Sequence, residues 1–439
     1  MDQLILSLAE LLAPLAPAFR KEVFPMFRMM VGAWVVCLGR RNISRVWETT
    51  GQSRDKHHSA AFRLFAQAVW NWDEVMRLLL VALLKQFVPG MRVWVVIDDT
   101  LCHKRGAKVA FGGIFLDPVL STRKHKTFRF GNNWVLLGLV VSVPFRRDRP
   151  FCVPMLWRVY EKRGTKTKAE HRTKVDLAAD MIRTLAGWLP GHEILVIADS
   201  AYMGKGLLKN RPVNVNAIGP ICWTAALMQV TQTKDGQEVS SGKRLPTPRE
   251  ILADDQGWPP EMQTIRFGNG QKRRLQLKAV VACWPTVVGE LPVVVVLVRD
   301  PAGEWRDEAL VSTNPKLADW EIVRGYCQRW CVEVAFADAK QQLGFHDACV
   351  WKEESVERAA PMAWFVGAVV LLWYARHGSE HPPAERHRPW YIKRVTTFSD
   401  MLSCCRLALW ESWWSDRGDK CPAKMDPEAW LLEYLATAA

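Results

Sequence analysis

The chain has 439 residues, 49% of them hydrophobic, which is long enough to bury a large core and to form two or three domains. A formal net charge of +14 favours a polyanionic partner, either nucleic acid or an anionic membrane surface. The eleven cysteines contain no Cys-x-x-Cys pair and the ten histidines are scattered, which argues against a disulfide framework and against structural zinc.

The first ninety residues have the patterning of helices. Two apolar stretches, 19–39 and 57–87, are joined by the polar segment 40–56, in which five side chains are Arg or Lys. These cations suit a small helical DNA-binding module, although an ordinary helix bundle would carry them equally well. We therefore predict a helical domain over 1–90, with DNA binding as its expected role.

After Pro89 the pattern changes from helical to β. We expect three strands, a helix and a fourth strand, over 93–99, 133–145, 152–160, 169–189 and 194–200. The first strand ends in Asp98 and Asp99, and the fourth ends at Asp199. These two strands can be neighbours in a mixed sheet, which would bring together aspartates that are about a hundred residues apart in sequence.

The stretch from Ser121 to Glu170 is strongly basic, with twelve Lys and Arg against three Asp and Glu. Such a stretch is typical of a phosphate-facing surface, although a solvated basic loop is about as common. We predict that this segment faces phosphates.

The most apolar run covers 359–375. It has 17 residues, contains Pro361 and is flanked by Arg358 and Arg376, which is marginal for crossing a bilayer, so we expect a buried core helix. The N-terminal stretch carries Asp2 and no basic leader, unlike a signal peptide. We therefore expect a cytoplasmic protein with no membrane partner.

The segment 215–314 is rich in β patterning around a polar centre, and we predict that it is an insertion into the α/β domain. The expected organisation is a first part of the core over 91–214, this β-rich insertion, a second part over 315–376 and a helical C-terminal region over 377–439.

Four polar side chains share one face of the helix expected around residue 333. Tyr326, Arg329, Glu333 and Lys340 are offset by 0, 3, 7 and 14 residues, which at about 100° per residue places them within an arc of roughly 60°. A mixed-charge face is usually a solvated one with weak ion pairs. If the helix packs on the sheet, however, Glu333 can join the two aspartates, and three converging carboxylates repel one another unless divalent cations lie between them.

The spacing of these four residues resembles the Tyr, two residues, Arg, three residues, Glu, six residues, Lys signature of bacterial insertion-sequence transposases of the Asp-Asp-Glu type. The stretches VVIDDT and VIADSAY resemble two further blocks of that group, and the match extends over roughly 90–350. The resemblance implies an α/β fold with a ribonuclease-H-like catalytic core, a β-rich insertion before the glutamate helix, and a helical N-terminal domain that binds the ends of the element.

The resemblance also implies a catalytic triad of Asp98, Asp199 and Glu333 that holds two Mg²⁺ ions, with Mn²⁺ as a substitute, for in-line displacement at a phosphodiester. Asp98 is preferred as the first ligand because a Thr follows it by two residues, as in the family; Asp99 is the alternative.

The rest of the helix face would then hold DNA. Arg329 and Lys340 are expected to bind the scissile or a neighbouring phosphate, and Tyr326 to position the backbone or pack against a sugar. A base-stacking aromatic of the family would correspond to Trp284 or Trp305, although most tryptophans are core residues.

Each of the three acidic positions also has an ordinary explanation. Asp98 and Asp99 could be turn carboxylates, Asp199 a helix N-cap and Glu333 a partner in a surface ion pair. Their order and their distance along the chain together favour the catalytic interpretation.

We therefore predict a DNA transposase that cuts element ends and joins them to target DNA, with double-stranded DNA and a second copy of the chain as partners. The expected location is the bacterial cytoplasm, in association with the nucleoid. A metal-dependent nuclease without strand transfer and a catalytically silent, transposase-derived DNA-binding protein are the alternatives.

Overall fold

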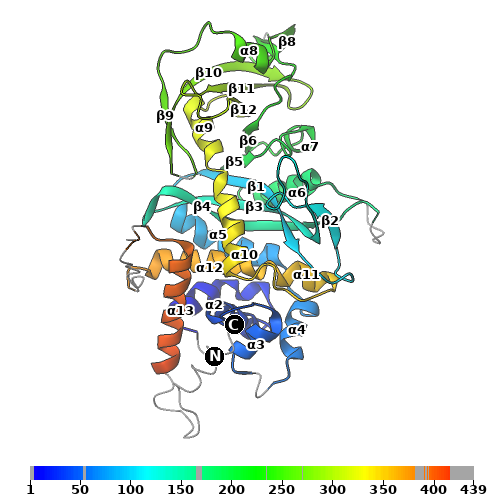
Figure 1. Cartoon of the computed structure of the whole chain (residues 1–439), viewed down its shortest axis with the longest axis vertical. Helices are drawn as coiled ribbons and strands as arrows, with labels where there is room; N and C mark the ends of the chain where they lie inside the picture. The colour runs from blue at the N-terminus through cyan, green and yellow to red at the C-terminus, as the bar shows by residue number, and fades with distance from the viewer. Residues whose placement is uncertain are drawn as a thin grey trace.

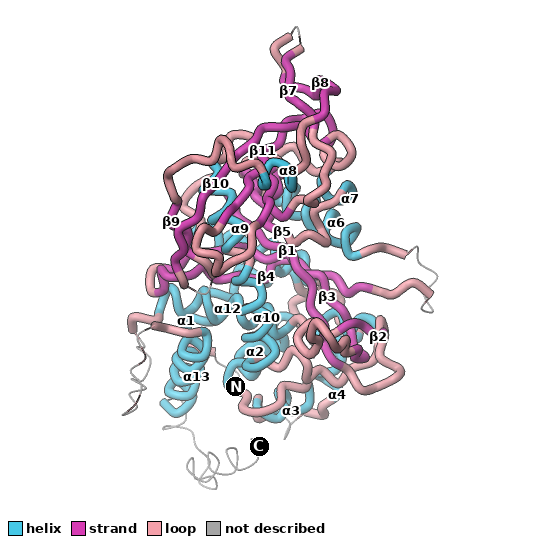
Figure 2. Tube along the Cα trace, turned by 45° about the horizontal axis from the view of Figure 1, so that its top comes forward, coloured by secondary structure: helices cyan, strands magenta, loops and turns pink. Residues whose placement is uncertain are grey.

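The computed structural model describes residues 4–52, 56–164, 171–233, 235–268, 270–380, 390, 393 and 395–415. Helices and a large mixed sheet make it an α/β protein (Figure 1). In Figure 2, α2, α3, α4 and α13 gather at one end of the molecule and the β7–β8 hairpin lies at the other. The expected α/β class is confirmed.

Helices make up the N-terminal part, as predicted. They are α1 (Leu6–Leu12), the 3₁₀ helix η1 (Ala13–Ala18), α2 (Phe24–Val36), α3 (Ile43–Thr49), α4 (Ser59–Ala66) and α5 (Trp72–Phe87). The side chains of Asn42 and Asn71 accept hydrogen bonds from the backbone at the start of α3 and α5, which fixes where these helices begin. The segment 40–56, expected as a polar joint, thus contains a short helix.

Strands fill the middle of the chain. They are β1 (Arg92–His103), β2 (Gly113–Leu116), β3 (Phe128–Val143), β4 (Arg146–Tyr160), β5 (Glu193–Ala198), β6 (Val215–Pro220), β7 (Met228–Gln232), β8 (Glu238–Arg244), β9 (Gln263–Arg266), β10 (Lys272–Trp284), β11 (Gly289–Arg299) and β12 (Glu308–Ser312). Among the described residues they form one sheet in the order β2-β3-β1-β5-β6-β12-β11-β10-β7-β8, with β4 on β3 and β9 on β10. The strands of 215–314 therefore continue the sheet that carries Asp98.

The expectation that the first strand stops at its aspartates is wrong. β1 remains paired with β3 as far as His103 and Gly131, whereas its pairing with β5 ends at Ile97 and Ala198. The two carboxylates thus lie in the middle of β1, at the point where its neighbour on one side stops. Hydrophobic patterning does not reveal where β1 ends, because a strand continues as long as one neighbouring strand supplies hydrogen bonds.

The remaining helices cover the sheet and close the helical end. They are α6 (Lys174–Trp188), α7 (Lys205–Leu208), α8 (Pro248–Ala253), α9 (Asp319–Cys327), α10 (Trp330–Gln342), α11 (Glu353–Ala359), α12 (Met362–His377) and α13 (Phe398–Ser415). The stretch Glu353–His377 is long and apolar enough to cross a membrane, but 83% of its most apolar window is buried inside the protein. The expected core helix is confirmed. Residues 381–389 and 416–439 of the predicted C-terminal region lie outside the described residues.

The N-terminal helices are bonded directly to the far end of α10. The indole Nε1 of Trp34 donates to the carbonyl of Leu343 over 2.8 Å, and the backbone N–H of Arg41 donates to Oδ2 of Asp347 over 2.9 Å. Arg41 is only 6% exposed, so this cation of the basic joint has a structural role. Apolar side chains of both parts belong to one hydrophobic core.

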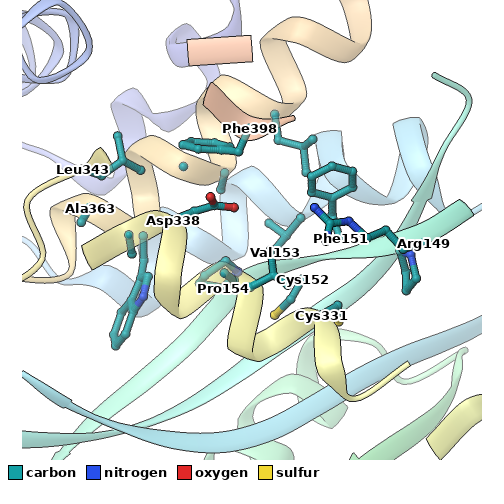
Figure 3. Close-up of a pocket in the computed structure, with 18 residues that line it drawn as sticks. Arg149, Phe151, Cys152, Val153, Pro154, Cys331, Asp338, Leu343, Ala363 and Phe398 are labelled. Atoms are coloured by element: carbon teal, nitrogen blue, oxygen red, sulfur yellow. The ribbon is translucent and has the colours of Figure 1, made fainter. Parts of the chain in front are cut away.

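A small cavity of about 40 Å³ lies between β4, α10, α12 and α13 (Figure 3). Asp338 of α10 borders it among largely apolar neighbours, including Leu343 and Phe398. Burial raises the pKa of the Asp338 carboxyl to about 6, although Arg149 and Arg146 act in the opposite direction. This carboxyl is therefore a destabilising feature of the helix that carries Glu333.

We expect Asp338→Asn to increase the free energy of unfolding near neutral pH by on the order of 2 kcal/mol, with little change near pH 4. The folded pKa lies above the ordinary value of 3.8, so the native state binds more protons between about pH 4 and 6, and the wild type loses stability as the pH rises through that window. Urea denaturation at several pH values measures the difference. A difference that does not vary with pH would contradict this account.

Candidate active site

The first two predicted carboxylates belong to adjacent parallel strands, one within its strand and one directly after it. β1 and β5 pair in register up to Ile97 and Ala198; Asp98 is the next residue of β1, and Asp199 is the first residue after the end of β5. Neighbouring strands are about 4.8 Å apart, which places these residues side by side. Asp199 also accepts a hydrogen bond from the backbone of Ala201 over 2.9 Å, which turns the chain away from the sheet after β5.

Arg329 joins the first carboxylate to the third. Its Nη1 donates to Oδ2 of Asp98 over 2.7 Å and its Nη2 donates to Oε1 of Glu333 over 2.8 Å. The side chains of Asp98, Arg329 and Glu333 are 16%, 22% and 36% exposed, so the bridge is shielded from water mainly on the Asp98 side. Such charge-assisted bonds are among the stronger hydrogen bonds of proteins.

Burial is the main electrostatic feature of Asp98. It raises the pKa of the carboxyl to about 7, while Arg329 and the backbone N–H of Asp99 lower it and the charge of Asp199 raises it further. Burial alone would lower the pKa of Arg329, but the charges of Asp98 and Glu333 raise it above its ordinary value. The guanidinium is thus the counter-charge of a buried acidic centre.

Asp99 has different partners from Asp98. Nζ of Lys174, at the start of α6, lies 2.6 Å from its Oδ2, and the hydroxyl of Tyr202 donates to its Oδ1 over 3.0 Å. Successive side chains of a strand point to opposite faces of the sheet, which explains why Asp98 meets Arg329 and Asp99 meets α6. Burial together with the Asp99 charge raises the pKa of the Tyr202 hydroxyl, so Tyr202 remains a donor.

The expectation of one continuous helix through the signature is wrong. α9 ends at Cys327 and α10 begins at Trp330. Between them the N–H groups of Gln328 and Arg329 bond to carbonyls three residues earlier, as in a tighter 3₁₀ turn. Arg329 therefore lies at the junction of two helices, from which it reaches both β1 and α10.

A glycine sets how closely α9 approaches the sheet. A Cβ on Gly325 would lie 2.5 Å from the ring of Trp94 on β1, so a larger residue would push α9 away. Tyr326 follows directly and is half-buried. Burial raises the pKa of its hydroxyl, Arg329 lowers it through charge and a hydrogen bond, and Asp199 raises it. The structure thus brings Tyr326 and Arg329 together with the acidic residues.

Lys340 is in a different environment from the other signature residues. It lies two turns beyond Glu333 on α10, and burial lowers the pKa of its amine, with Cys102 and Asp117 acting in the opposite direction. Neither of these is one of the three predicted catalytic carboxylates. The predicted phosphate contact of Lys340 stays a prediction.

The donor chemistry of Asp98, Asp199 and Glu333 suits a hard divalent cation, because carboxylate oxygens are the ligands that Mg²⁺ prefers. In the described part of the chain, however, no group of three or more His, Cys, Asp or Glu side chains is arranged to hold a metal ion. Glu333 is paired with Arg329 instead. The donors fit Mg²⁺, and holding it would require Glu333 to turn from Arg329 towards the two aspartates.

The two contacts of Asp99 were not predicted from the sequence. Tyr202 follows Asp199 by three residues in the stretch ADSAY, and this proximity was a usable signal. Nothing in the sequence distinguishes Lys174.

The two tryptophans of the insertion that were candidates for base stacking are both packed against other side chains. Trp284 is 6% exposed and packs in the core, which excludes base stacking. Trp305 packs edge-on against Phe267, with the ring centroids 4.7 Å apart.

Comparison with known proteins gives the family. The model of the DDE superfamily endonucleases matches residues 14–280, which is more than half of the chain. The chain belongs to this family. The matched range contains Asp98 and Asp199 and ends before Glu333, so the third carboxylate rests on the structure and on the spacing of the signature.

One similar solved structure is a cryo-EM synaptic complex of piggyBac transposase with hairpin DNA. The TM-score is 0.45 and the identity 12%, with 100% of this chain and 83% of that chain covered. No curated protein matches the chain.

The Arg329 bridge predicts a specific stability pattern for this DDE superfamily endonuclease. Arg329→Ala leaves Asp98 buried without its counter-charge and should lower the free energy of unfolding by on the order of 2–3 kcal/mol. Adding Asp98→Asn removes the buried charge that has lost its partner. The double variant should therefore lose less free energy of unfolding than the sum of the losses of the two single variants.

Chemical denaturation of the four proteins in chelator measures this coupling. The matched control is Arg324→Ala, an exposed arginine on α9 whose loss should cost within about 0.5 kcal/mol. Strict additivity of the Arg329 and Asp98 substitutions would show that the bridge is not formed in solution.

Proposed function

We propose that this DDE superfamily endonuclease is a metal-dependent DNA transposase that cuts phosphodiester bonds at the ends of a bacterial insertion sequence and joins them to target DNA. The observation that carries the proposal is that Arg329 bridges Asp98 and Glu333 while Asp199 follows the strand paired next to Asp98, so that three acidic residues from segments far apart in the sequence lie near one another. A solvated helix face would not require such convergence.

The order of the core strands supports the ribonuclease-H-like assignment. β4, β3 and β1 are antiparallel neighbours, and β5 and β6 continue from β1 in parallel. The helix α6 connects β4 to β5, and this crossover brings β5 next to β1 in the sheet. This connection places Asp98 beside Asp199.

Asp98, Asp199 and Glu333 would hold two Mg²⁺ ions, which would supply Lewis-acid stabilisation of the in-line displacement at phosphorus. Arg329 would then turn its guanidinium to the phosphate, because its planar donors match phosphate as well as carboxylate. Tyr326, beside Arg329, would contact the DNA backbone or a sugar. Lys174 and Tyr202 would keep Asp99 on the opposite face of β1.

Double-stranded DNA is the proposed partner, in agreement with the net charge of +14. Joining two element ends in one complex makes a homodimer the expected assembly, and the site of action is the nucleoid in the bacterial cytoplasm. A nuclease without strand transfer would give nicked or broken products only, so an assay with labelled element ends and an unlabelled target plasmid distinguishes the two activities.

We expect strand cleavage at the element ends to require Mg²⁺ or Mn²⁺ and to be lost in chelator. The substrate is a labelled duplex that carries the inverted repeat bordering the coding region. Glu333→Gln should eliminate cleavage while its affinity for the same duplex, measured in chelator, stays close to that of the wild type. Undiminished cleavage in chelator would refute the metal-dependent mechanism.

The two adjacent aspartates should differ in their effect. Asp98→Asn should abolish cleavage, because Asp98 faces Arg329 and Glu333. Asp99→Asn should retain measurable cleavage and mainly lose stability, because it removes the charge that pairs with Lys174 and leaves one acceptor oxygen for the two donors, Lys174 and Tyr202. Cleavage rates and unfolding curves of both variants test this. The reverse pattern would show that Asp99 is the catalytic ligand.

A further inference from the structure

A polar groove of about 480 Å³ lies beside the proposed active site, between the β3–β4 turn, β9 and α9. Figure 1 shows β9 descending from the upper strands towards β4, alongside α9. Cys327 and Gln328 line the groove, and the next residue is Arg329, which holds Asp98 and Glu333. The groove therefore reaches the turn between α9 and α10 that carries Arg329.

The groove is lined by cations from three separate parts of the chain. They are Arg146, Arg147, Arg149, Arg266, Lys272 and Arg324, against one carboxylate, Asp148. That carboxylate is already paired with Arg146 over 3.2 Å. The charge of Asp148 also acts on Arg149, so Arg147, Arg266, Lys272 and Arg324 are left without a carboxylate partner among the residues that line the groove.

Several of these cations are free to bind a ligand. Arg147, Lys272 and Arg324 are exposed, and within the described ranges their side chains make no hydrogen bond or ion pair. Arg266 is exposed too, and its one bond, to the carbonyl of Asp148, is long at 3.5 Å. Gathering unpaired cations from distant segments costs electrostatic energy, which an anionic ligand would offset.

Aromatic surfaces border the same groove. Trp320 and Phe267 line it, and Trp320 is 41% exposed. Trp330, 48% exposed, lies against Gly268 at its edge, where a Cβ on the glycine would come within 2.4 Å of the tryptophan Cβ. Cations that follow a backbone together with rings that can stack on bases are the features of sites for single-stranded nucleic acid.

The size of the groove separates a single strand from a duplex. A volume of about 480 Å³ is too small to enclose a DNA duplex. A duplex could therefore only lie over the opening, whereas the backbone and bases of one strand can enter.

We propose that this groove binds one unpaired DNA strand by its phosphates, next to the phosphodiester that the carboxylates attack, with Trp320 stacking on a base. The position of the strand beside the cleaved phosphodiester rests on the proposed function. The affinity of the protein for a single strand is argued from the groove alone. Separation of the strands at a cleavage site would expose such a segment.

The test is binding of labelled oligodeoxythymidine of about 12 nucleotides, with a duplex of equal length as the comparison probe. Measurements are made in chelator, so that cleavage plays no part. In the variant Arg147→Gln, Arg266→Gln, Arg324→Gln, we expect single-strand affinity to fall at least tenfold and the slope of log affinity against log salt to decrease by about two units, since each phosphate contact accounts for about 0.7. Duplex affinity should fall less.

Two controls separate charge from position. The same three residues changed to Lys keep the charge and should retain most of the single-strand affinity. Arg306→Gln removes an 81% exposed arginine outside the groove and should leave that affinity unchanged. Trp320→Ala should lower affinity for oligodeoxythymidine about five- to tenfold with an unchanged salt slope, because stacking releases no counterions.

Unchanged single-strand affinity in the Gln variant would overturn the proposal, and so would a larger loss for the duplex, which would indicate a duplex surface. These outcomes leave the proposed function intact if the wild type cleaves element ends. Conversely, a wild-type protein that fails to cleave but binds the single strand through the groove would overturn the transposase function and keep the groove.

Discussion

The guanidinium of Arg329 is the one group on which the arrangement of the site depends. It holds a carboxylate of β1 and a carboxylate of α10 at hydrogen-bonding distance, and it lies at the turn between α9 and α10. Two carboxylates at this spacing would repel each other in a partly buried setting, so the fixed cation between them lets α10 approach the sheet. The same group is suited to exchange carboxylate for phosphate, because both offer a pair of oxygens to its planar donors.

The sheet supplies the second constraint. Since β5 stops where β1 continues, the backbone of β1 at Asp98 is open on the side of β5 while β3 holds it on the other side. Asp98 is thus held by a strand that is paired well beyond it, which limits its movement more than a loop would. The ion pair between Asp99 and Lys174 of α6 holds Asp99 on one face of β1, and Asp98 therefore points to the opposite face.

Much of the fold could be predicted from the sequence, because its signals are local. Apolar runs marked β1, β3, β4 and β5, although β3 and β4 begin five and six residues before the predicted strands, and helical periodicity marked the N-terminal helices. The candidate site was indicated because the strands of Asp98 and Asp199 can be neighbours in a mixed sheet and because the spacing around Glu333 resembles the signature of Asp-Asp-Glu transposases. The break before Trp330 could not be predicted, since helical periodicity continues through the turn at Gln328 and Arg329 that separates α9 from α10. The groove was only partly indicated: Arg147 belongs to the basic stretch 121–170 that was predicted to face phosphates, but Arg266 and Arg324 come from two other segments, whose proximity depends on the path of β9.

The bonds from Trp34 and Arg41 to the segment after α10 have a consequence for how the chain can be divided. Glu333 is at one end of α10, and the other end is fastened to the N-terminal helices, which share a hydrophobic core with β3, β4 and α12. A truncation that begins near residue 90 would expose that core and release the far end of the helix. The region that resembles an accessory module in the sequence is thus part of the framework of the site, and exchanging it between relatives would require its contact surface to be exchanged as well.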